Sequence, residues 1–313
     1  MPLPLRTGNF GRLFSEGIEP EPPPAPAALR LRRQAALHEN FSVRARRLMR
    51  VVAGLVRPRR AASLAATFDL FLRDRLVKSP ALPDPRRARP SADGLAGLAP
   101  DLAPGSVMEA YAQGLSPSAS LGPIAWHSRT IRSVAAPAEI IAAQDSLTEG
   151  ADPAWNVTFD RDIETVLARS GRPAGHAAIM PARLLDAFAD LFDAGFAHSF
   201  EVRDAAGETI GGGFGVAVGG IFTIEGAFEA AAPGAARFGL AHLAKRLADS
   251  HFTFVELAPG VAWLGPDLFH ETPREDYLAQ LALHMGDEKI GRWRNRDAAK
   301  APTTPAEDGR LAA

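Results

Sequence analysis

The sequence predicts an α+β fold built on one mixed sheet with flanking helices. Three observations support this class. A helical stretch at 181–194 comes first, and three strand-like stretches follow at about 197–204, 208–217 and 220–226. A further helix and a buried-looking strand complete the order. Because helices and strands do not alternate regularly, the pattern is not that of a doubly wound parallel sheet.

Proline and glycine mark the ends of the predicted helices. The piece LAPGSVMEAYAQG has Pro104 near its start and Gly114 past its end, which is typical of a helix. The helix PARLLDAFADLFDA begins at Pro181 and ends before Gly195. Its apolar face consists of Leu184, Leu185, Phe188, Leu191 and Phe192. Between the two helices, IAWHSRTIRSV is predicted to be one extended segment.

The three predicted strands form a meander. The pieces DAAGE and the glycine pair at 219–220 fit hairpin turns. The stretch ARFGLAHLAKRLADS has helical periodicity, and HFTFVELA has the apolar run of a buried strand. The meander should therefore join a helix and a further strand in one sheet.

Changes in composition separate the N-terminal part of the chain from a compact mixed domain that begins past residue 95. The segment EPEPPPAPAA is a stiff spacer that cannot build a core. A basic stretch then carries apolar residues at helical spacing, and a second proline- and arginine-rich linker follows it. We expect a disordered leader (1–28) and a basic helical extension with its linker (29–95), followed by the compact mixed domain.

Charge and composition restrict the function. Residues 28–90 carry a net charge of about +12 and residues 91–313 about −12, although the whole chain is at −1. With no cysteine, the chain has no disulfide, thiolate metal ligand or cysteine nucleophile. No stretch approaches the roughly 18 to 20 apolar residues of a membrane span, and the N-terminus lacks secretory-signal features, so a cytoplasmic protein is expected.

Glu225 is the most informative candidate, because it follows a glycine-rich apolar run, GGIFTIEGAF. A glutamate near a strand end is usually solvated at the rim of a protein. A buried carboxylate, by contrast, requires a cation or hydrogen-bond donors to offset its desolvation. Residues alone leave both interpretations open.

Six stretches, in this order, resemble one known family. They are DLAPGSVMEAYAQGLSP, PIAWHSRTIRSV, PARLLDAFADLFDAGFAHSFEV, GGGFGVAVGGIFTIEGAF, FVELA and LGPDLFHETPREDYLAQL. Together they run from about 101 to 283 and are similar to the leucyl/phenylalanyl-tRNA–protein transferases. Each stretch is short, but six in sequence order are hard to obtain by chance.

The resemblance implies a fold, a reaction and two partners. It implies a small N-terminal domain (96–150) followed by an acetyltransferase-like (GNAT-like) main domain (151–285), with a tail (286–313). The implied reaction moves leucine or phenylalanine from a charged tRNA to the N-terminal amine of a protein that begins with arginine or lysine, which marks that protein for degradation. No metal and no diffusible cofactor is implied.

The same resemblance implies the site residues. Glu225 falls where the family has a glutamate that holds the cationic acceptor, and Glu256 where it has an aspartate that helps to take the proton from the attacking amine. Apolar residues would bind the substrate: Trp126, Phe222, Ile224 and Phe228. Core packing is the alternative for Trp126 and Phe228, and a surface ion pair the alternative for Glu256.

Several residues depart from the family pattern. Ala258 stands where a glutamine is expected, and alanine can neither relay a proton nor orient an amine. Ser116–Ser118 and Ala178 replace aromatic residues suited to stacking on tRNA bases. We expect Arg44, Arg47 and Arg50 in the basic extension to bind the nucleic acid instead. A membrane surface or an acidic partner is the alternative for this extension.

Two other functions remain open at this stage. A non-catalytic relative would bind a protein N-terminus or RNA, which the loss at Ala258 favours. An acyl-CoA-dependent N-acyltransferase would place a pyrophosphate at the start of the helix in GAARFGLA, although this stretch matches the usual pattern imperfectly.

Overall fold

The computed structural model describes residues 81–285 except 91–92, 120–122, 172–179 and 231, together with isolated positions between 33 and 49 and at 291 and 293. The strands are β1 (Leu95–Leu98), β2 (Ser116–Ser118), β3 (Ala125–His127), β4 (Ile131–Ala135), β5 (Asn156–Phe159), β6 (Ala197–Arg203), β7 (Thr209–Val218), β8 (Ile221–Glu229), β9 (Phe254–Leu257) and β10 (His270–Pro273). The helices are η1 (Pro85–Arg87), α5 (Pro104–Ala112), α6 (Pro137–Ala142), α7 (Gln144–Leu147), α8 (Ile163–Ser170), α9 (Ala182–Asp193), α10 (Ala235–Asp249), η3 (Pro259–Leu264) and α11 (Arg274–His284).

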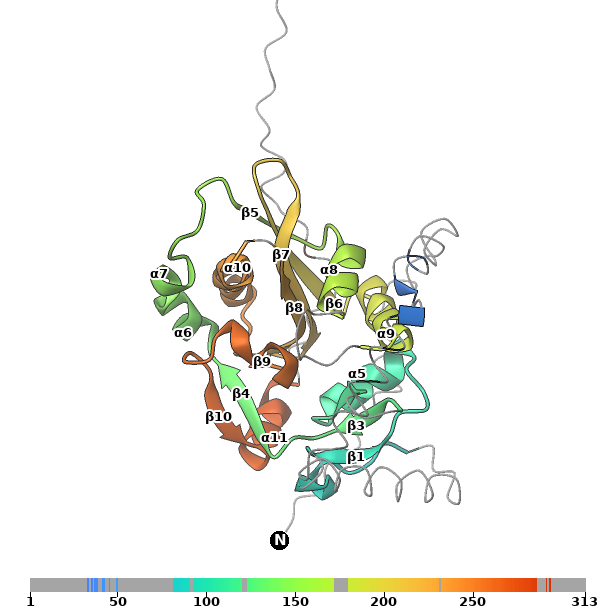
Figure 1. Cartoon of the computed structure of the whole chain (residues 1–313). Helices are drawn as coiled ribbons and strands as arrows, with labels where there is room; N and C mark the ends of the chain where they lie inside the picture. The colour runs from blue at the N-terminus through green and yellow to red at the C-terminus, as the bar shows by residue number, and fades with distance from the viewer. Residues whose placement is uncertain are drawn as a thin grey trace, which may run out of the picture.

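A mixed seven-stranded sheet runs through the main part of the molecule (Figure 1). Its strand order is β10-β4-β9-β8-β7-β6-β5. Strands β8 and β9 are parallel neighbours joined through α10, and the other neighbours in this sheet are antiparallel. The predicted α+β class and the meander β6-β7-β8 are therefore confirmed.

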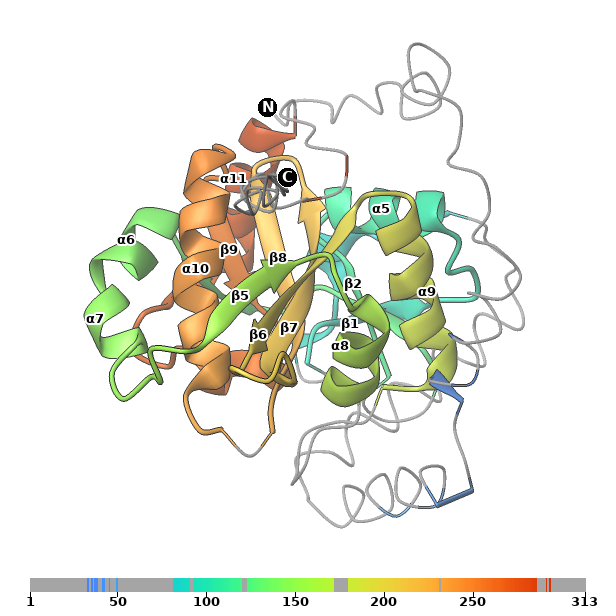
Figure 2. The same cartoon turned by 90° about the horizontal axis from the view of Figure 1, so that it is seen from above.

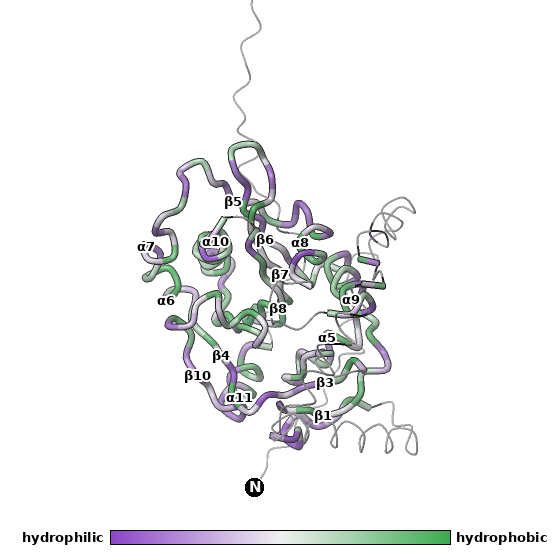
Figure 3. The backbone as a smooth tube through the Cα atoms, in the orientation of Figure 1, coloured by the Kyte–Doolittle hydropathy of each residue, from purple (hydrophilic) through white to green (hydrophobic). Residues whose placement is uncertain are grey.

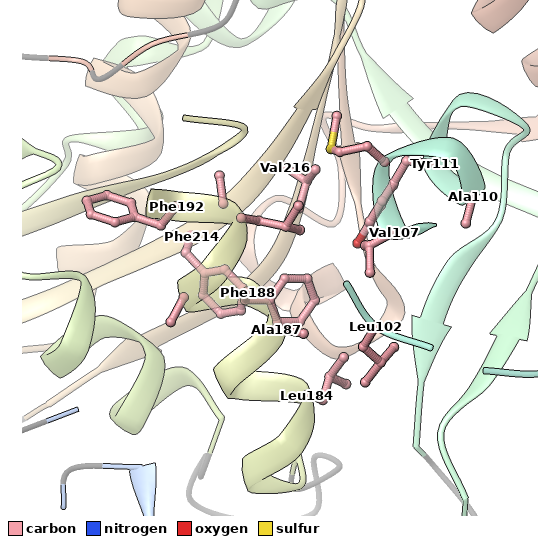
Figure 4. Packing of buried hydrophobic residues seen from close by; sticks show 14 of the residues in the cluster. Leu102, Val107, Ala110, Tyr111, Leu184, Ala187, Phe188, Phe192, Phe214 and Val216 are labelled. Carbon is pink, nitrogen blue, oxygen red and sulfur yellow. The ribbon is translucent and has the colours of Figure 1, made fainter. Parts of the chain in front are cut away.

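Helices cover both faces of this sheet. Figure 2 shows α6, α7 and α10 on one side of the strands and α5, α8 and α9 on the other. Helix α9 has its apolar stripe buried as the spacing predicts, and Figure 4 shows Phe188 of α9 close to Phe214 of β7. Their ring centroids are 5.0 Å apart in an edge-on arrangement, which is favourable for aromatic pairs.

The two faces of the sheet belong to separate hydrophobic clusters. Phe222 and Ile224 pack on the α10 side, whereas Val216 packs with α5 and α9 on the other side. Figure 3 shows hydrophobic residues along the central strands and hydrophilic stretches mainly at the periphery. This division follows from the alternation of side chains along a strand.

A small antiparallel sheet, ordered β1-β3-β2, lies beside α5. The segment IAWHSRTIRSV, predicted as one extended stretch, is divided between this sheet and the large one, because β3 ends at His127 and β4 begins at Ile131. That prediction was therefore incomplete. Residues of both expected domains, Trp126 and Phe188 among them, pack in one cluster.

Isolated described positions of the basic extension contact the main domain. Arg33 forms ion pairs with Glu164 of α8 and with Asp193 at the end of α9, at 3.0 and 2.6 Å. Leu37 is buried in the cluster that contains Phe188. Arg33 and Leu37 therefore attach the extension, at these two positions, to the α8 and α9 side of the sheet.

Candidate active site

Glu225 occupies a bulge in β8. In the pairing with β7, Phe214 lies opposite Gly226 and Gly215 opposite Ile224, so Glu225 is the extra residue on its strand. A bulge of this kind turns a side chain away from the regular alternation and is frequent beside active sites. As a consequence, Phe228 packs on the α5 side, while the even-numbered residues before the bulge pack on the α10 side.

Glu225 also follows the last paired position between the parallel strands. The register of β8 with β9 ends at Ile224 opposite Leu257, and the Ala258 amide donates to the Ile224 carbonyl at 3.0 Å. Strand β8 continues to Glu229, whereas the chain after Leu257 turns into η3. The Glu225 carboxylate therefore stands at the point where the two strands separate.

Tyr111 of α5 holds the Glu225 carboxylate. Its hydroxyl donates to Glu225 Oε1 at 2.7 Å, and Glu225 is 6% exposed. Figure 4 shows Tyr111 among the buried residues that α5 and α9 bring together. Among the residues that the structure describes, none donates a hydrogen bond to the second oxygen, Oε2.

The environment of Glu225 changes its acidity. Burial raises the pKa of Glu225 to about 7, against the opposing effects of the Tyr111 hydrogen bond and the nearby Arg129 charge. Burial, followed by the negative charge of Glu225, raises the pKa of Tyr111 well above its usual value. Tyr111 is thus a neutral donor beside a carboxyl group that exchanges its proton near neutral pH.

Glu256 of β9 lies in the same buried region but has different surroundings. Its Oε1 accepts from Arg132 Nη1 at 2.7 Å. Its Oε2 accepts from the hydroxyls of Thr223, at 3.0 Å, and Tyr277, at 2.8 Å. The Arg132 guanidinium also donates to the Gly114 carbonyl and lies 4.4 Å from the centroid of the Tyr277 ring. Both oxygens of Glu256 are therefore engaged.

Arg132 neutralises Glu256. Burial alone would lower the pKa of Arg132, but the charge and hydrogen bond of Glu256, together with Tyr277 and Glu225, outweigh this effect and raise it. Burial and the charge of Glu256 raise the pKa of Tyr277 well above its usual value, so Tyr277 is a neutral donor. The result is a buried ion pair enclosed by hydroxyl donors.

The structure brings together the two glutamates and separates them from two of the predicted substrate contacts. Phe222 and Ile224 are fully buried on the α10 face, behind the sheet as seen from Glu225. This burial agrees with core packing, and the predicted contact of Phe222 and Ile224 with substrate stays a prediction. Phe228 packs on the same face as Tyr111, with the Arg169 guanidinium 5.4 Å from its ring centroid, and its binding role stays a prediction.

Trp126 is a core residue in this structure. It is 2% exposed and belongs to the cluster beneath α5 and α9. This burial agrees with the packing alternative, and the predicted contact of Trp126 with substrate remains a prediction. Arg44, Arg47 and Arg50 lie outside the described residues, so their predicted contact with nucleic acid also remains a prediction.

Sequence reasoning missed the residues that hold the glutamates: Tyr111, Arg132, Thr223 and Tyr277. One signal was available, because the chain contains only two tyrosines. Both of them, Tyr111 and Tyr277, donate their hydroxyls to the two candidate glutamates. Such a concentration of a rare residue type at one site could have directed attention to them.

Two further findings concern ligands and membranes. Within the described ranges, no group of three or more His, Asp or Glu side chains is arranged to hold a metal ion. No helix in that part of the chain is long and apolar enough to span a membrane.

The buried carboxylates Glu225 and Glu256 share one region of the mixed sheet, and Oε2 of Glu225 accepts no hydrogen bond from the described residues, an arrangement that suits an enzyme. Comparison with known proteins identifies the family. The family model for leucyl/phenylalanyl-tRNA protein transferase matches residues 137–282. A relative of that name from Maridesulfovibrio salexigens is 31% identical over 220 residues, which cover 69% of this chain and 88% of the relative. Another from Anaeromyxobacter dehalogenans is 32% identical over 238 residues, covering 73% and 98%. The chain belongs to the leucyl/phenylalanyl-tRNA–protein transferase family.

Proposed function

We propose that this protein transfers leucine or phenylalanine from a charged tRNA to the N-terminal amine of a protein that begins with a basic residue, and thereby marks it for degradation. Membership in the family supports the reaction. The observation that carries the assignment to this site is the buried Glu225 carboxylate, whose Oε2 accepts no hydrogen bond from the described part of the chain. A substrate ammonium would supply the donor that this oxygen lacks.

The chemistry suits a site without a metal. The aminoacyl ester of a charged tRNA is already activated, so the protein has to position the amine, take up its proton and stabilise the developing oxyanion. The net charge of about −12 on residues 91–313 favours the approach of a cationic N-terminus. We place the reaction in the cytoplasm, where charged tRNA is available.

The proposal includes an acetyltransferase-like (GNAT-like) architecture for the main domain. Its support is the parallel pair β8 and β9, the helix α10 that connects them, and their separation beside the bulge at Glu225. The acyl-CoA alternative gains no support from this domain. At the start of α10 the Ala236 amide donates to the Glu229 carboxylate at 3.1 Å, and this negative charge would repel a pyrophosphate.

The basic extension is proposed to bind the tRNA backbone. The acidic region at 91–313 would repel phosphates, and the opposite charge is concentrated in residues 28–90. Replacing Arg44, Arg47 and Arg50 together by alanine should weaken tRNA binding. It should also make the slope of log affinity against log salt concentration less steep, by the equivalent of up to about three phosphate contacts. Fluorescence anisotropy across a salt series measures both, and unchanged affinity and slope would exclude these arginines from the interface.

The function is tested by transfer of radiolabelled leucine and phenylalanine from charged tRNA to a peptide that begins with arginine. We expect label in the peptide with charged tRNA as donor, and none with free amino acid or with an N-acetylated peptide. Peptides that begin with aspartate should be poor acceptors, since they bring a carboxylate towards Glu225. Absence of transfer by folded protein, with intact charged tRNA, would contradict the proposal.

A binding role without catalysis is the second candidate, and Ala258 favours it. Ala258 is buried at the start of η3, and its side chain offers no group for proton transfer. Under this reading the peptide that begins with arginine would bind, and the labelled amino acid would stay on the tRNA. Isothermal titration with the same peptide, run beside the transfer assay, separates the two functions.

A further inference from the structure

Two buried glutamates lie in this site, and they differ in how their oxygens are used. Glu256 accepts hydrogen bonds from Arg132, Thr223 and Tyr277, which engage both of its oxygens. Glu225 accepts one, from Tyr111, on Oε1. A general base needs a lone pair that can point at the proton it removes. Of the roughly four acceptor sites of a carboxylate, Glu256 uses three and Glu225 one, and Oε2 of Glu225 is the oxygen of the pair that accepts no hydrogen bond from the described residues.

The two carboxylates also differ in the charges around them, and this difference likewise favours Glu225 as the proton acceptor. Protonation of Glu256 would remove the partner of the Arg132 guanidinium, 2.7 Å away, and leave a buried cation uncompensated. Protonation of Glu225 leaves no such buried cation, because its hydrogen-bond donor is the neutral Tyr111. A proton can therefore enter and leave the Glu225 carboxyl group without breaking a buried ion pair.

We infer that the Tyr111–Glu225 pair accepts the proton of the attacking amine, and that Glu256 acts as a positioning residue that fixes Arg132 and Tyr277. This inference rests on the proposed function and differs from the role that the sequence resemblance implied for Glu256. It assigns the acid–base chemistry to the residue in the bulge, beside the point where β8 and β9 separate.

The proposed step forms one amide bond and breaks one ester bond. The substrate ammonium gives one proton to Glu225 Oε2, and the nitrogen lone pair forms a bond to the ester carbonyl carbon of the aminoacyl-tRNA. The bond between that carbon and the ribose oxygen breaks, and its electron pair remains on the oxygen. Glu225 passes the first proton to the ribose oxygen, then takes the remaining excess proton from the nitrogen as the amide forms and releases it to solvent. The products are the amide, the uncharged tRNA and one proton.

The acidity of Glu225 suits this step. Burial raises its pKa to about 7, which is close to the ordinary value of about 7.7 to 8.0 for an N-terminal amine. Proton exchange between groups of similar pKa requires little free energy. The charged and titratable groups that act on Glu225 are Tyr111 from α5, Arg129 after β3, Arg132 from β4 and Glu256 from β9.

The two tyrosines provide a matched test. Tyr111→Phe removes the donor to Glu225, and Tyr277→Phe removes a donor to Glu256. The Tyr111 hydrogen bond lowers the pKa of Glu225, so its loss raises that pKa further. The fall in kcat/KM on the acid side should therefore move to higher pH by about one unit in Tyr111→Phe. In Tyr277→Phe the pH of this acid-side fall in kcat/KM should not change. Ionisation of the peptide amine affects both profiles equally and cancels in the comparison.

A second readout is independent of activity. In protein carrying ¹³C-labelled glutamate carboxyl groups, a resonance should titrate near pH 7, disappear in Glu225→Gln and move to higher pH in Tyr111→Phe. The inference would be overturned if the acid-side fall in kcat/KM shifted in Tyr277→Phe alone. It would also be overturned if the resonance that titrates near pH 7 disappeared in Glu256→Gln instead of in Glu225→Gln. If the wild-type protein shows no transfer, the proposed function fails, and the titration still decides which carboxyl group can take a proton.

Discussion

Replacing Glu225 by glutamine is expected to lower the rate of aminoacyl transfer by about 10²- to 10⁴-fold, which is the usual contribution of a general base. Glutamine keeps the size of the side chain and can still accept from Tyr111, but it carries no charge and cannot take a proton. The effect should appear in kcat/KM for the peptide that begins with arginine. The measurement is transfer of labelled leucine under single-turnover conditions.

The fold of this variant should be intact, which separates chemistry from stability. Because the pKa of Glu225 is raised in the folded state, its contribution to stability is present below pH 4.5 and is lost as the pH rises towards 7. Glu225→Gln should consequently be at least as stable as the wild type above pH 7. Glu225→Asp, which keeps the charge, should retain part of the activity. Full activity in Glu225→Gln would exclude this residue from proton transfer.

Replacing Glu256 by leucine is expected to lower the free energy of unfolding by about 3 to 5 kcal/mol, because one partner of a buried ion pair is removed. Arg132 is left as a buried cation, and the hydroxyls of Thr223 and Tyr277 lose their acceptor. Urea unfolding followed by circular dichroism measures the change. This is the largest stability effect that we expect from a single substitution in the site.

The control for this prediction is the double variant Arg132→Met with Glu256→Leu. Replacement of both charges by apolar side chains removes the uncompensated cation, so most of the lost stability should return. The cost of Arg132→Met alone should resemble that of Glu256→Leu. If the two single changes are each close to neutral, the ion pair does not organise the site.

The sequence was sufficient to predict the elements with strong periodicity. The helix that begins after Pro181 and the meander β6-β7-β8 are confirmed, since their apolar residues repeat at helical or alternating spacing. Strand β5 and helices α8 and α11 were not individually predicted. Strand β5 has four residues and helix α8 eight. Helix α11 has eleven, but its buried side chains are limited to Arg274, Tyr277 and Leu281, and Tyr277 contacts the distant Glu256.

The candidate site was predicted in part. Glu225 and Glu256 could be named from the resemblance, and both lie in one buried region. Their partners come from α5, β4, β8 and α11, and no local pattern states that these elements meet. Phe222 and Ile224 are three and one positions before Glu225, so simple alternation already places them on the opposite face of the strand. The bulge changes this alternation after Ile224 and thereby brings Phe228 to the face of Glu225 and Tyr111. A bulge depends on the pairing with β7, which the sequence of β8 alone does not reveal.

The central claim is that Glu225 Oε2 receives the amine of the acceptor. A crystal structure of the protein with a peptide that begins with arginine tests this claim most directly. We predict that the N-terminal nitrogen lies within hydrogen-bond distance of Glu225 Oε2, at about 2.6 to 3.2 Å, with Tyr111 still bound to Oε1 and the ion pair of Arg132 and Glu256 unbroken. The account would be contradicted if the N-terminal nitrogen were bound to Glu256 with Arg132 displaced. It would also be contradicted if that nitrogen lay far from both carboxylates.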